Sequence, residues 1–398
     1  PLRDAFGIRG GAQDLPWLFF GTFLVSLVTA PLQAAIAARL PRQRFVPVMY
    51  LFLVANMLIF WALLKFEVAP KIVGYAFFMW ITVFSVFTVS IFWSFLSDIY
   101  SSEQSKRLFG FVAAGGSLGS ILGPILTRNL VTPLGVHNLL WVSGVLLIAA
   151  VWCANRLDKA APEMQAADPD FVAASAGRAK QAVGGGMFDG FPLLFKSPYL
   201  GGIALWVFLL SLLGTFLYFV QAHLVASMTT DTAERTRIFA LIAQWVGILS
   251  LLVQLAGTGR IIKKIGSGAA LAILPLVFVF GFASLMFFST LLAVASFQAL
   301  QRAANFGIAN VARESLWPVV SREEKFKAKN IVDGAVFRAA DFVNAFLYTG
   351  LSKLMAVQPW LAGLAAVIAA GWFTLSLALG RAREKRVVEQ AALEKKST

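Results

Sequence analysis

Long uninterrupted apolar stretches dominate the pattern of hydrophobic and polar positions along this chain. A helix needs about 20 apolar residues to cross ~30 Å of hydrocarbon, and stretches of that length recur from near the first residue to about residue 380. They predict eleven membrane-spanning helices, at about 15–38, 46–65, 72–97, 108–127, 136–155, 199–226, 238–258, 268–288, 290–312, 330–352 and 359–380. A membrane β-barrel would instead show short alternating segments. The pattern therefore predicts an all-α membrane protein.

One long polar stretch, rich in Ala and Gly, divides the predicted helices. It runs over residues 157–198 and predicts a cytoplasmic linker. The division gives an N-terminal transmembrane half over 1–156, a C-terminal half over 199–380 and a cytoplasmic tail over 381–398. Five spans precede the linker and six follow it. We expect an additional first helix before Pro1, which would make two six-helix halves; a removed signal sequence is the alternative.

Composition narrows the class of protein. Of the 398 residues, 59% are hydrophobic and 14% are charged, whereas a soluble domain carries roughly 25% charged residues. A soluble enzyme and a disordered chain are therefore excluded. The single cysteine, Cys153, excludes a disulfide framework and a four-cysteine metal site. The sequence also contains no nucleotide-loop, metal-ligand or catalytic-triad motif, so we expect no enzyme activity, cofactor or resident metal.

The location of the basic residues explains the net charge of +14. Most of the 34 Lys and Arg residues lie in alternate connections, the linker and the C-terminal tail. Lys and Arg accumulate on the cytoplasmic side of membrane proteins. The charge therefore indicates membrane topology, with the C-terminus in the cytoplasm, and no nucleic-acid partner is expected.

Polar residues inside the predicted spans are the candidate binding residues, because burying them in lipid is costly unless they face a cavity or a partner. In span 290–312 the side chains of Gln298, Gln301, Arg302 and Asn305 follow helical spacing and share one face. We expect this face to line a cavity, where the Arg302 guanidinium suits phosphate or carboxylate. The alternative is a buried ion pair between Arg302 and a carboxylate.

Other spans add further candidates. Span 330–352 carries Arg338 and Asp341; Asp341 could pair with Arg338 or Arg302, or bind a proton that drives transport. Span 199–226 adds Tyr218 and Gln221 to the predicted substrate site.

Charged residues near the span ends are candidates for gating. Asp98 could pair with Lys106 or Arg107, although a solvated helix end explains it equally well. Asp333 is expected to act as a gate or a helix cap, and Arg3 to lie at the external mouth.

Glycines in span 108–127 form a regular stripe. Gly115, Gly119 and Gly123 repeat every fourth residue, a spacing that allows close contact between transmembrane helices. We therefore expect another helix to pack against this face.

Three sequence stretches carry a resemblance to a known family. They are LRD at 2–4, FWSFLSDIYSSEQSKRLFGFVAAGGSLGSILGP at 92–124 and NVARESLWPVVSREEKFKAKNIVDG at 310–334. Together they resemble the major facilitator superfamily, and within it the bacterial relatives of the nucleotide (ATP/ADP) translocases. The resemblance implies two six-helix halves around a central substrate site and transport by alternating access.

The departures from the family pattern bear on the substrate. The first-helix lysine of the family falls on Phe6, and its eleventh-helix lysine falls near Asp341, while the acidic residue of its second motif is kept as Asp98. The seventh-helix glutamate aligns with Gln221. With two phosphate-binding lysines missing, the resemblance implies fold and transport more than ATP/ADP exchange.

We therefore expect a monomeric secondary transporter of a small, sometimes phosphorylated, organic anion in a bacterial inner membrane, with H⁺ as a candidate coupling ion. ATP/ADP exchange is the first alternative. A lipid flippase or a non-transporting membrane scaffold is the second.

Overall fold

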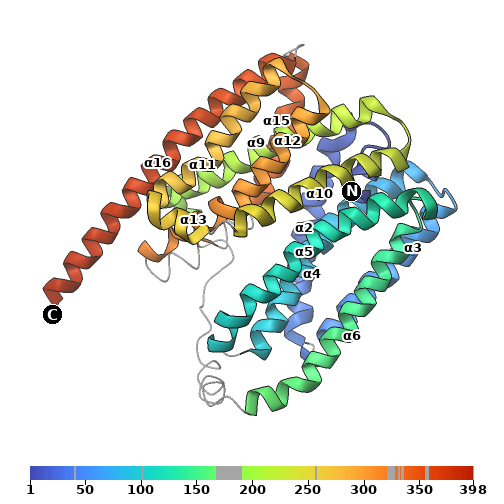
Figure 1. Ribbon diagram of the computed structural model, residues 1–398, viewed down its shortest axis with the longest axis horizontal. Coiled ribbons are helices and arrows are strands. Elements are labelled where there is room, and N and C mark those ends of the chain that lie inside the picture. Colours follow the sequence, from blue (N-terminus) through green and yellow to red (C-terminus); the bar gives the residue numbers. More distant parts are fainter. Residues whose placement is uncertain are drawn as a thin grey trace. The chain divides into compact units, whose positions relative to one another are not determined.

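The computed structural model describes residues 1–39, 42–100, 102–166, 191–255, 258–320, 328–329, 332, 336–354 and 358–397. Every regular element among these residues is a helix (Figure 1). This confirms the predicted all-α class. The chain divides into two compact units. Unit 1 comprises residues 1–183 and 229–241, and unit 2 comprises residues 184–228 and 242–398.

Unit 1 contains the helices of the first part of the chain. They are α1 (Leu2–Gly7), η1 (Ala12–Asp14), α2 (Leu15–Arg39), α3 (Arg42–Lys65), α4 (Pro70–Ile99), α5 (Ser102–Leu134), α6 (Leu139–Ala166) and the first part of α10 (Thr232–Leu255). Helices α3 and α6 lie side by side. One apolar cluster gathers Phe6, Leu64, Phe77 and Leu139, and it packs α1 against the ends of α3, α4 and α6.

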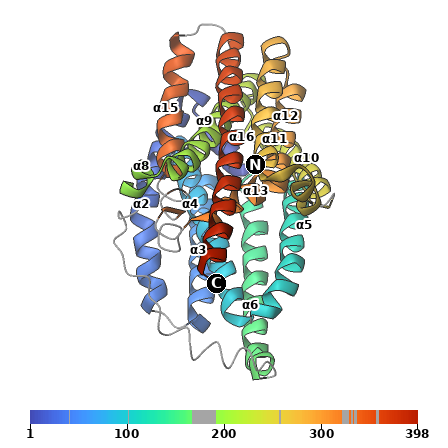
Figure 2. The same ribbon diagram turned by 90° about the vertical axis from the view of Figure 1, so that its left-hand side faces the viewer.

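Unit 2 contains the remaining elements. They are α8 (Phe191–Lys196), α9 (Pro198–Met228), the rest of α10, α11 (Thr258–Phe287), α12 (Leu291–Ala304), the π-helical turn η2 (Asn305–Ala309), α13 (Asn310–Glu314), η3 (Trp317–Val319), α15 (Phe337–Leu354) and α16 (Gln358–Ser397). Helix α16 runs alongside α11 in both views (Figures 1 and 2).

Close packing of α11 on α16 depends on two small residues and a set of aromatic rings. A Cβ atom added to Gly268 would lie 2.9 Å from the Cα atom of Gly380, so only glycine permits this approach of the two backbones. Farther along, Trp206 and Trp372 contact each other with ring centroids 5.1 Å apart, and Phe278 lies 5.5 Å from Trp372. The Trp206 indole also donates a hydrogen bond of 2.9 Å to Ser376.

Eight helices among the described residues are long and apolar enough to cross a membrane. The described parts of the predicted spans lie largely in helices, and several of these helices extend beyond the predicted boundaries. Helix α6 continues to Ala166, inside the predicted linker, and α16 continues through the predicted tail to Ser397. Ala, Glu, Lys and Arg are abundant in both extensions and favour helix without needing an apolar environment. Predicted span 290–312 is a helix interrupted by the turn η2.

The predicted helix contact along the glycine stripe of α5 is wrong for the part of the chain that the structure describes. Gly115, Gly119 and Gly123 are exposed, and a Cβ atom added to any of them would meet no described atom within 4 Å. The repeat permits close packing but does not supply a neighbour. Here no described element of unit 1 covers that face of α5.

Candidate functional site

Buried polar side chains of unit 2 gather where α9 packs against α12 and α15. Helix α9 is apolar along most of its length, yet Ser211, Thr215 and Gln221 are each about 95% buried. Their spacing places them along one side of the helix. A buried polar group needs a hydrogen-bond partner to offset its lost hydration, so these residues indicate where α9 meets polar groups of other helices.

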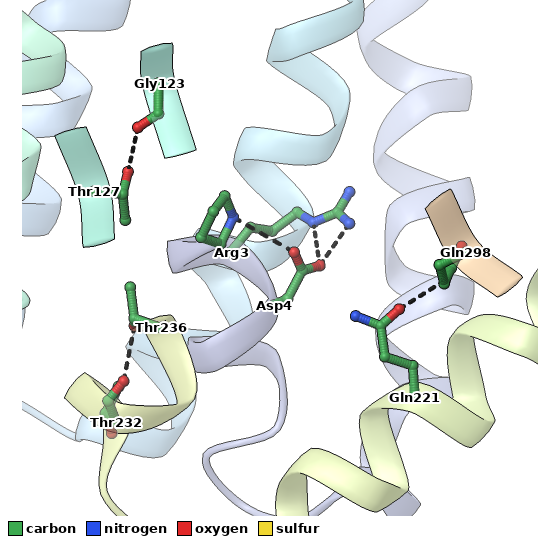
Figure 3. Close-up of polar contacts among 9 residues, drawn as sticks. Arg3, Asp4, Gly123, Thr127, Gln221, Thr232, Thr236 and Gln298 are labelled. Carbon is green, nitrogen blue, oxygen red and sulfur yellow. Dashed lines mark hydrogen bonds and ion pairs between the residues drawn. The ribbon is translucent and has the colours of Figure 1, made fainter. Parts of the chain in front are cut away.

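Gln221 and Gln298 connect α9 to α12. The Nε2 atom of Gln298 donates a hydrogen bond of 2.7 Å to Oε1 of Gln221, and both side chains are buried (Figure 3). Gln301, one turn farther along α12, is also buried. The structure thus brings together two of the predicted site residues, Gln221 and Gln298, which lie on different helices.

A second set of hydrogen bonds connects α9 to α15. Asn344 donates from Nδ2 to the hydroxyl oxygen of Ser211 over 3.1 Å, and the Ser211 hydroxyl donates to Oδ1 of Asp341 over 2.7 Å. Ser211 was not among the residues predicted for the site. The signal that could have revealed it is its position one helical turn before Thr215 and ten residues before Gln221.

Two amide oxygens in this region have no hydrogen-bond partner among the described residues. They are Oδ1 of Asn344, a residue that is completely buried, and Oδ1 of Asn305. A buried acceptor left unsatisfied costs about 1–3 kcal/mol. Water or a ligand with hydrogen-bond donors would remove that cost.

Asn305 begins the π-helical turn η2, which lies between α12 and α13. A π-turn inserts one extra residue into a helix, changes the direction of the following side chains and is frequent at functional sites. Gly307, Ile308 and Ala309 in the turn are buried. The row of polar residues on α12 therefore ends at the π-helical turn η2, where the regular helix face is interrupted.

Arg302 differs from its polar neighbours in exposure. Gln298 and Gln301 are buried, Asn305 is partly buried, and Arg302 is exposed on the surface of unit 2. Consecutive turns of α12 therefore present buried amides and an exposed cation. Such a cation can meet an anion without the cost of burying an unpaired charge.

Aromatic rings border the polar set on the side of α9 that faces α15. Tyr348 is buried, and its ring contacts Phe219 at 4.9 Å and Phe216 at 5.2 Å between centroids. His223 stacks on Phe219, and its Nδ1 atom lies 2.9 Å from the Phe219 carbonyl oxygen, as expected for a packing residue. Tyr218 also contacts Phe219, edge to face at 6.2 Å.

An apolar pocket adjoins these rings. It is lined by Phe216, Val220, Phe282, Leu285, Ser289, Tyr348, Leu361 and Ala362, from α9, α11, the connection after α11, α15 and α16. The lining is almost wholly hydrophobic. The pocket therefore offers packing space beside the polar set and few groups that would recognise a charged molecule.

The other predicted residues lie apart from this set or outside the described residues. In unit 1, Arg3 donates two hydrogen bonds to Asp4, of 3.0 and 2.6 Å, so the charge of Arg3 is matched within its own helix (Figure 3). The side chains of Asp98, Lys106, Arg107 and Arg338 lie outside the described residues, as does the whole of Asp333. Among the described residues, no group of three or more His, Cys, Asp or Glu side chains could hold a metal ion.

The long apolar helices define a multi-pass membrane protein, and buried polar side chains connect its helices α9, α12 and α15. Residues 1–318 match the family model of the Major Facilitator Superfamily. The chain belongs to this superfamily, as the resemblance predicted.

Curated relatives and solved structures agree with the family. The chain is 22% identical over 356 residues to ADP,ATP carrier protein 1 of Chlamydia trachomatis, which covers 78% of this chain and 66% of the relative. It is 23% identical over 338 residues to ADP,ATP carrier protein 1 of Chlamydia pneumoniae, which covers 75% of this chain and 64% of the relative. The chain thus spans about two thirds of the length of these relatives.

The structural neighbours share the fold. The crystal structure of the nucleoside transporter NupG superposes with a TM-score of 0.60 at 12% identity, covering 94% of this chain and 96% of the other. The inward-facing structure of a bacterial homologue of the iron transporter ferroportin gives a TM-score of 0.59 at 13% identity, covering 94% of both chains. At such identities the likeness concerns the fold alone.

Proposed function

We propose that this transporter moves a small organic anion with one or two negative charges, including phosphorylated compounds, across a bacterial inner membrane by alternating access. The observation that carries the proposal is the set of unsatisfied amide oxygens, on Asn305 and Asn344, in the same unit as the exposed cation Arg302. A ligand with hydroxyl or amino donors would satisfy these two oxygens, and its anionic group would bind at Arg302. Arg302 can hold carboxylate or phosphate through two parallel hydrogen bonds.

The charge balance of the polar set favours a ligand of low charge. Among its described side chains, Arg302 supplies a positive charge and Asp341 a negative one. A nucleoside triphosphate carries about four negative charges, and binding it away from bulk water requires several fixed cations or a metal. A monoanion or dianion fits this set better.

ATP/ADP exchange is the alternative, and the similarity to the chlamydial ADP,ATP carrier proteins favours it. It would need phosphate-binding cations beyond those just described. A scaffold without transport activity would make no use of the orphaned oxygens on Asn305 and Asn344. A lipid flippase could use them for a headgroup with hydroxyl or amino donors, and the lysolipids in the screen below test that alternative.

The test is transport by the purified chain in proteoliposomes. Sugar phosphates, nucleoside monophosphates, dicarboxylates, lysolipids and ATP or ADP are first screened by thermal shift, and stabilising compounds are then tested in radiolabelled counterflow. We expect a mono- or dianionic metabolite to stabilise the protein and to exchange, and ATP and ADP at millimolar concentration to do neither. ATP/ADP counterflow would overturn the substrate class in favour of the alternative.

Arg302 variants test the site itself. Arg302→Gln should abolish counterflow while the protein remains folded, and Arg302→Lys should restore little because the bidentate geometry is lost. Arg381→Gln is the matched control, since Arg381 is an exposed cation on α16. Normal counterflow by Arg302→Ala would place the substrate site elsewhere.

A further inference from the structure

A separate group of basic side chains lies in unit 1, near the ends of α1, α3 and α6. Arg9 follows α1, and its backbone N–H donates to the Phe6 carbonyl over 3.2 Å. Its Nη1 atom is buried and has no hydrogen-bond partner among the described residues. A buried guanidinium nitrogen is costly to leave without an acceptor. Its position therefore calls for an acceptor, and an anion is the strongest kind.

His137 faces the same residue, Phe6, from the connection between α5 and α6. The two rings stack with centroids 6.2 Å apart and planes 25° apart. Burial lowers the pKa of His137 below its usual 6.5, and the charges of Arg9 and Lys65 lower it further, while Glu67 acts in the opposite direction. Leu64, the neighbour of Lys65, and Val136, the neighbour of His137, lie with Phe6 in one apolar cluster, so the segments that carry the three basic side chains come together there.

The backbone around these side chains is firmly held. Arg235 is 5% exposed and donates to two carbonyl oxygens, that of Ile8 over 2.7 Å and that of Thr229 over 2.8 Å. The indole of Trp61 donates to Oδ1 of Asn138 over 2.9 Å, beside His137. These bonds hold the segments that carry Arg9 and His137, so a ligand would not have to order them on binding.

The nearby carboxylates do not balance the positive charges of Arg9 and Lys65. Asp14 forms an ion pair of 2.9 Å with Lys71 and accepts a hydrogen bond from Tyr75. Glu67, which opposes Arg9 and Lys65, lies in a strained turn: it has φ of 51° and Ala69 has φ of 41°. Neither Arg9 nor Lys65 forms an ion pair with a described residue. With Asp14 paired to Lys71, Glu67 is the carboxylate that acts on His137 in opposition to the two cations.

We propose that Arg9, Lys65 and His137 form an anion-binding site in unit 1 that takes a phosphate, sulfate or carboxylate group and binds it more tightly when His137 is protonated. The guanidinium of Arg9 supplies the orphaned N–H, Lys65 adds a flexible charge at the exposed side, and the protonated imidazole adds a second donor. This site is independent of the polar set in unit 2 and does not rest on the proposed substrate.

The experiment follows the nuclear magnetic resonance signal of His137, which is simple to identify because the chain contains one other histidine, His223. The full chain, labelled with ¹⁵N-histidine, is placed in nanodiscs of neutral phosphatidylcholine, and the His137 signal is identified by its loss in His137→Gln. Sulfate is the probe because its charge is constant between pH 5.5 and 7.5. We expect sulfate to raise the pKa of His137. We also expect its affinity to increase from pH 7.5 to 5.5 by at most roughly thirtyfold, the gain when one added positive charge lies about 4 Å from the two negative charges of sulfate in water.

Variants decide which side chains are responsible. Arg9→Gln should remove the response to sulfate, and Lys65→Gln should weaken it, which provides a second measurement if Arg9→Gln does not fold. Arg128→Gln, which removes a cation of α5 outside the group, should leave the response unchanged. An equal response in Arg9→Gln and the unmodified protein would overturn the proposal, and so would the absence of any response of His137 both to sulfate and to the anionic lipid described next.

A second set of nanodiscs contains anionic phosphatidylglycerol and no sulfate, and it distinguishes a dissolved anion from a lipid headgroup. A response to sulfate in neutral nanodiscs supports a site for soluble anions. A response of His137 only to phosphatidylglycerol, lost in Arg9→Gln, would keep the site and assign it to a lipid headgroup.

Discussion

Gln221 and Gln298 satisfy each other across α9 and α12, whereas Asn305 and Asn344 each keep a buried oxygen without a partner among the described residues. The paired and the unpaired amides affect the stability of the protein and the binding of a ligand differently. A satisfied pair stabilises the packing of its helices and has little left to offer a ligand. An orphaned oxygen lowers stability and is available for binding. Under the proposed function, stability and substrate recognition therefore depend on different amide side chains of the same unit.

The Gln221–Gln298 pair gives a test of stability. Gln221→Leu or Gln298→Leu alone should lower the free energy of unfolding by about 1–3 kcal/mol, because each leaves the other buried amide unpaired. The double variant should be close to the unmodified protein. Unfolding in detergent, arranged as a double-mutant cycle, measures the coupling. Additive losses in the double variant would show that the hydrogen bond is not what the two side chains contribute.

Asp341 gives a test of proton coupling. In Asp341→Asn the Ser211 hydroxyl keeps an acceptor, but the charge that could bind a proton is gone. If Asp341 carries the coupling proton, a pH gradient should no longer drive uptake into proteoliposomes, while counterflow at equal pH continues. Glu384→Gln, at an exposed position of α16, is the control. Uptake by Asp341→Asn that still follows the pH gradient would exclude this role.

Helical spacing predicted which polar residues lie near Arg302 on α12. It did not predict which of them are buried or which residues of other helices they contact. The repeat in the sequence places Gln298, Gln301, Arg302 and Asn305 near one another on a helix surface. Which of them is buried depends on how α9 packs there, and the partners Ser211 and Asp341 are 130 residues apart in the chain. A contact of that separation leaves no local pattern, so it could not be predicted from one sequence.

At the scale of helices, apolar runs located nearly every element, and the errors have identifiable causes. The π-turn η2 was not predicted, because its residues, NFGIA, are as apolar as a continuous span. The extensions of α6 and α16 were missed because a search for apolar runs ends where charge begins, although charged residues such as Glu and Lys also favour helix. Apolar runs therefore locate the buried or membrane-spanning part of a helix, but they do not show where the helix ends.

Two glycine positions give a prediction at the helix scale. Gly380→Ala should destabilise unit 2 by roughly 1–3 kcal/mol, since the added methyl group would collide with the backbone at Gly268 and force α11 and α16 apart. Gly119→Ala should be neutral or stabilising by up to about 1 kcal/mol, because alanine favours helix and meets no described atom. Apparent melting temperatures in detergent compare the two. Equal destabilisation would mean that the Gly119 face is covered in the intact protein.

At the scale of the whole molecule, membership in the superfamily and the distribution of basic residues together predict the topology. The C-terminal end of α16 is expected in the cytoplasm, and the beginning of α10 on the opposite side. After replacement of Cys153, single cysteines at the exposed positions Glu234 and Glu389 can be labelled from either side of the membrane. An impermeant reagent applied outside intact cells should reach position 234 only. Labelling of both positions from outside would contradict the predicted orientation.

Helix α16 has a mechanical consequence. Its 40 residues make it about 60 Å long, roughly twice the thickness of the hydrocarbon layer. Arg383 attaches the part just beyond the apolar segment to unit 2, donating to the Ser315 carbonyl over 2.8 Å. The part of α16 beyond Arg383 extends away from this attachment. A small tilt of unit 2 in the membrane would therefore displace the end of α16 at Ser397 by a larger distance. If transport proceeds by alternating access, as proposed, a distance probe near Glu389 on this extension should show a larger change between transport states than a probe near Trp360 at the other end of α16.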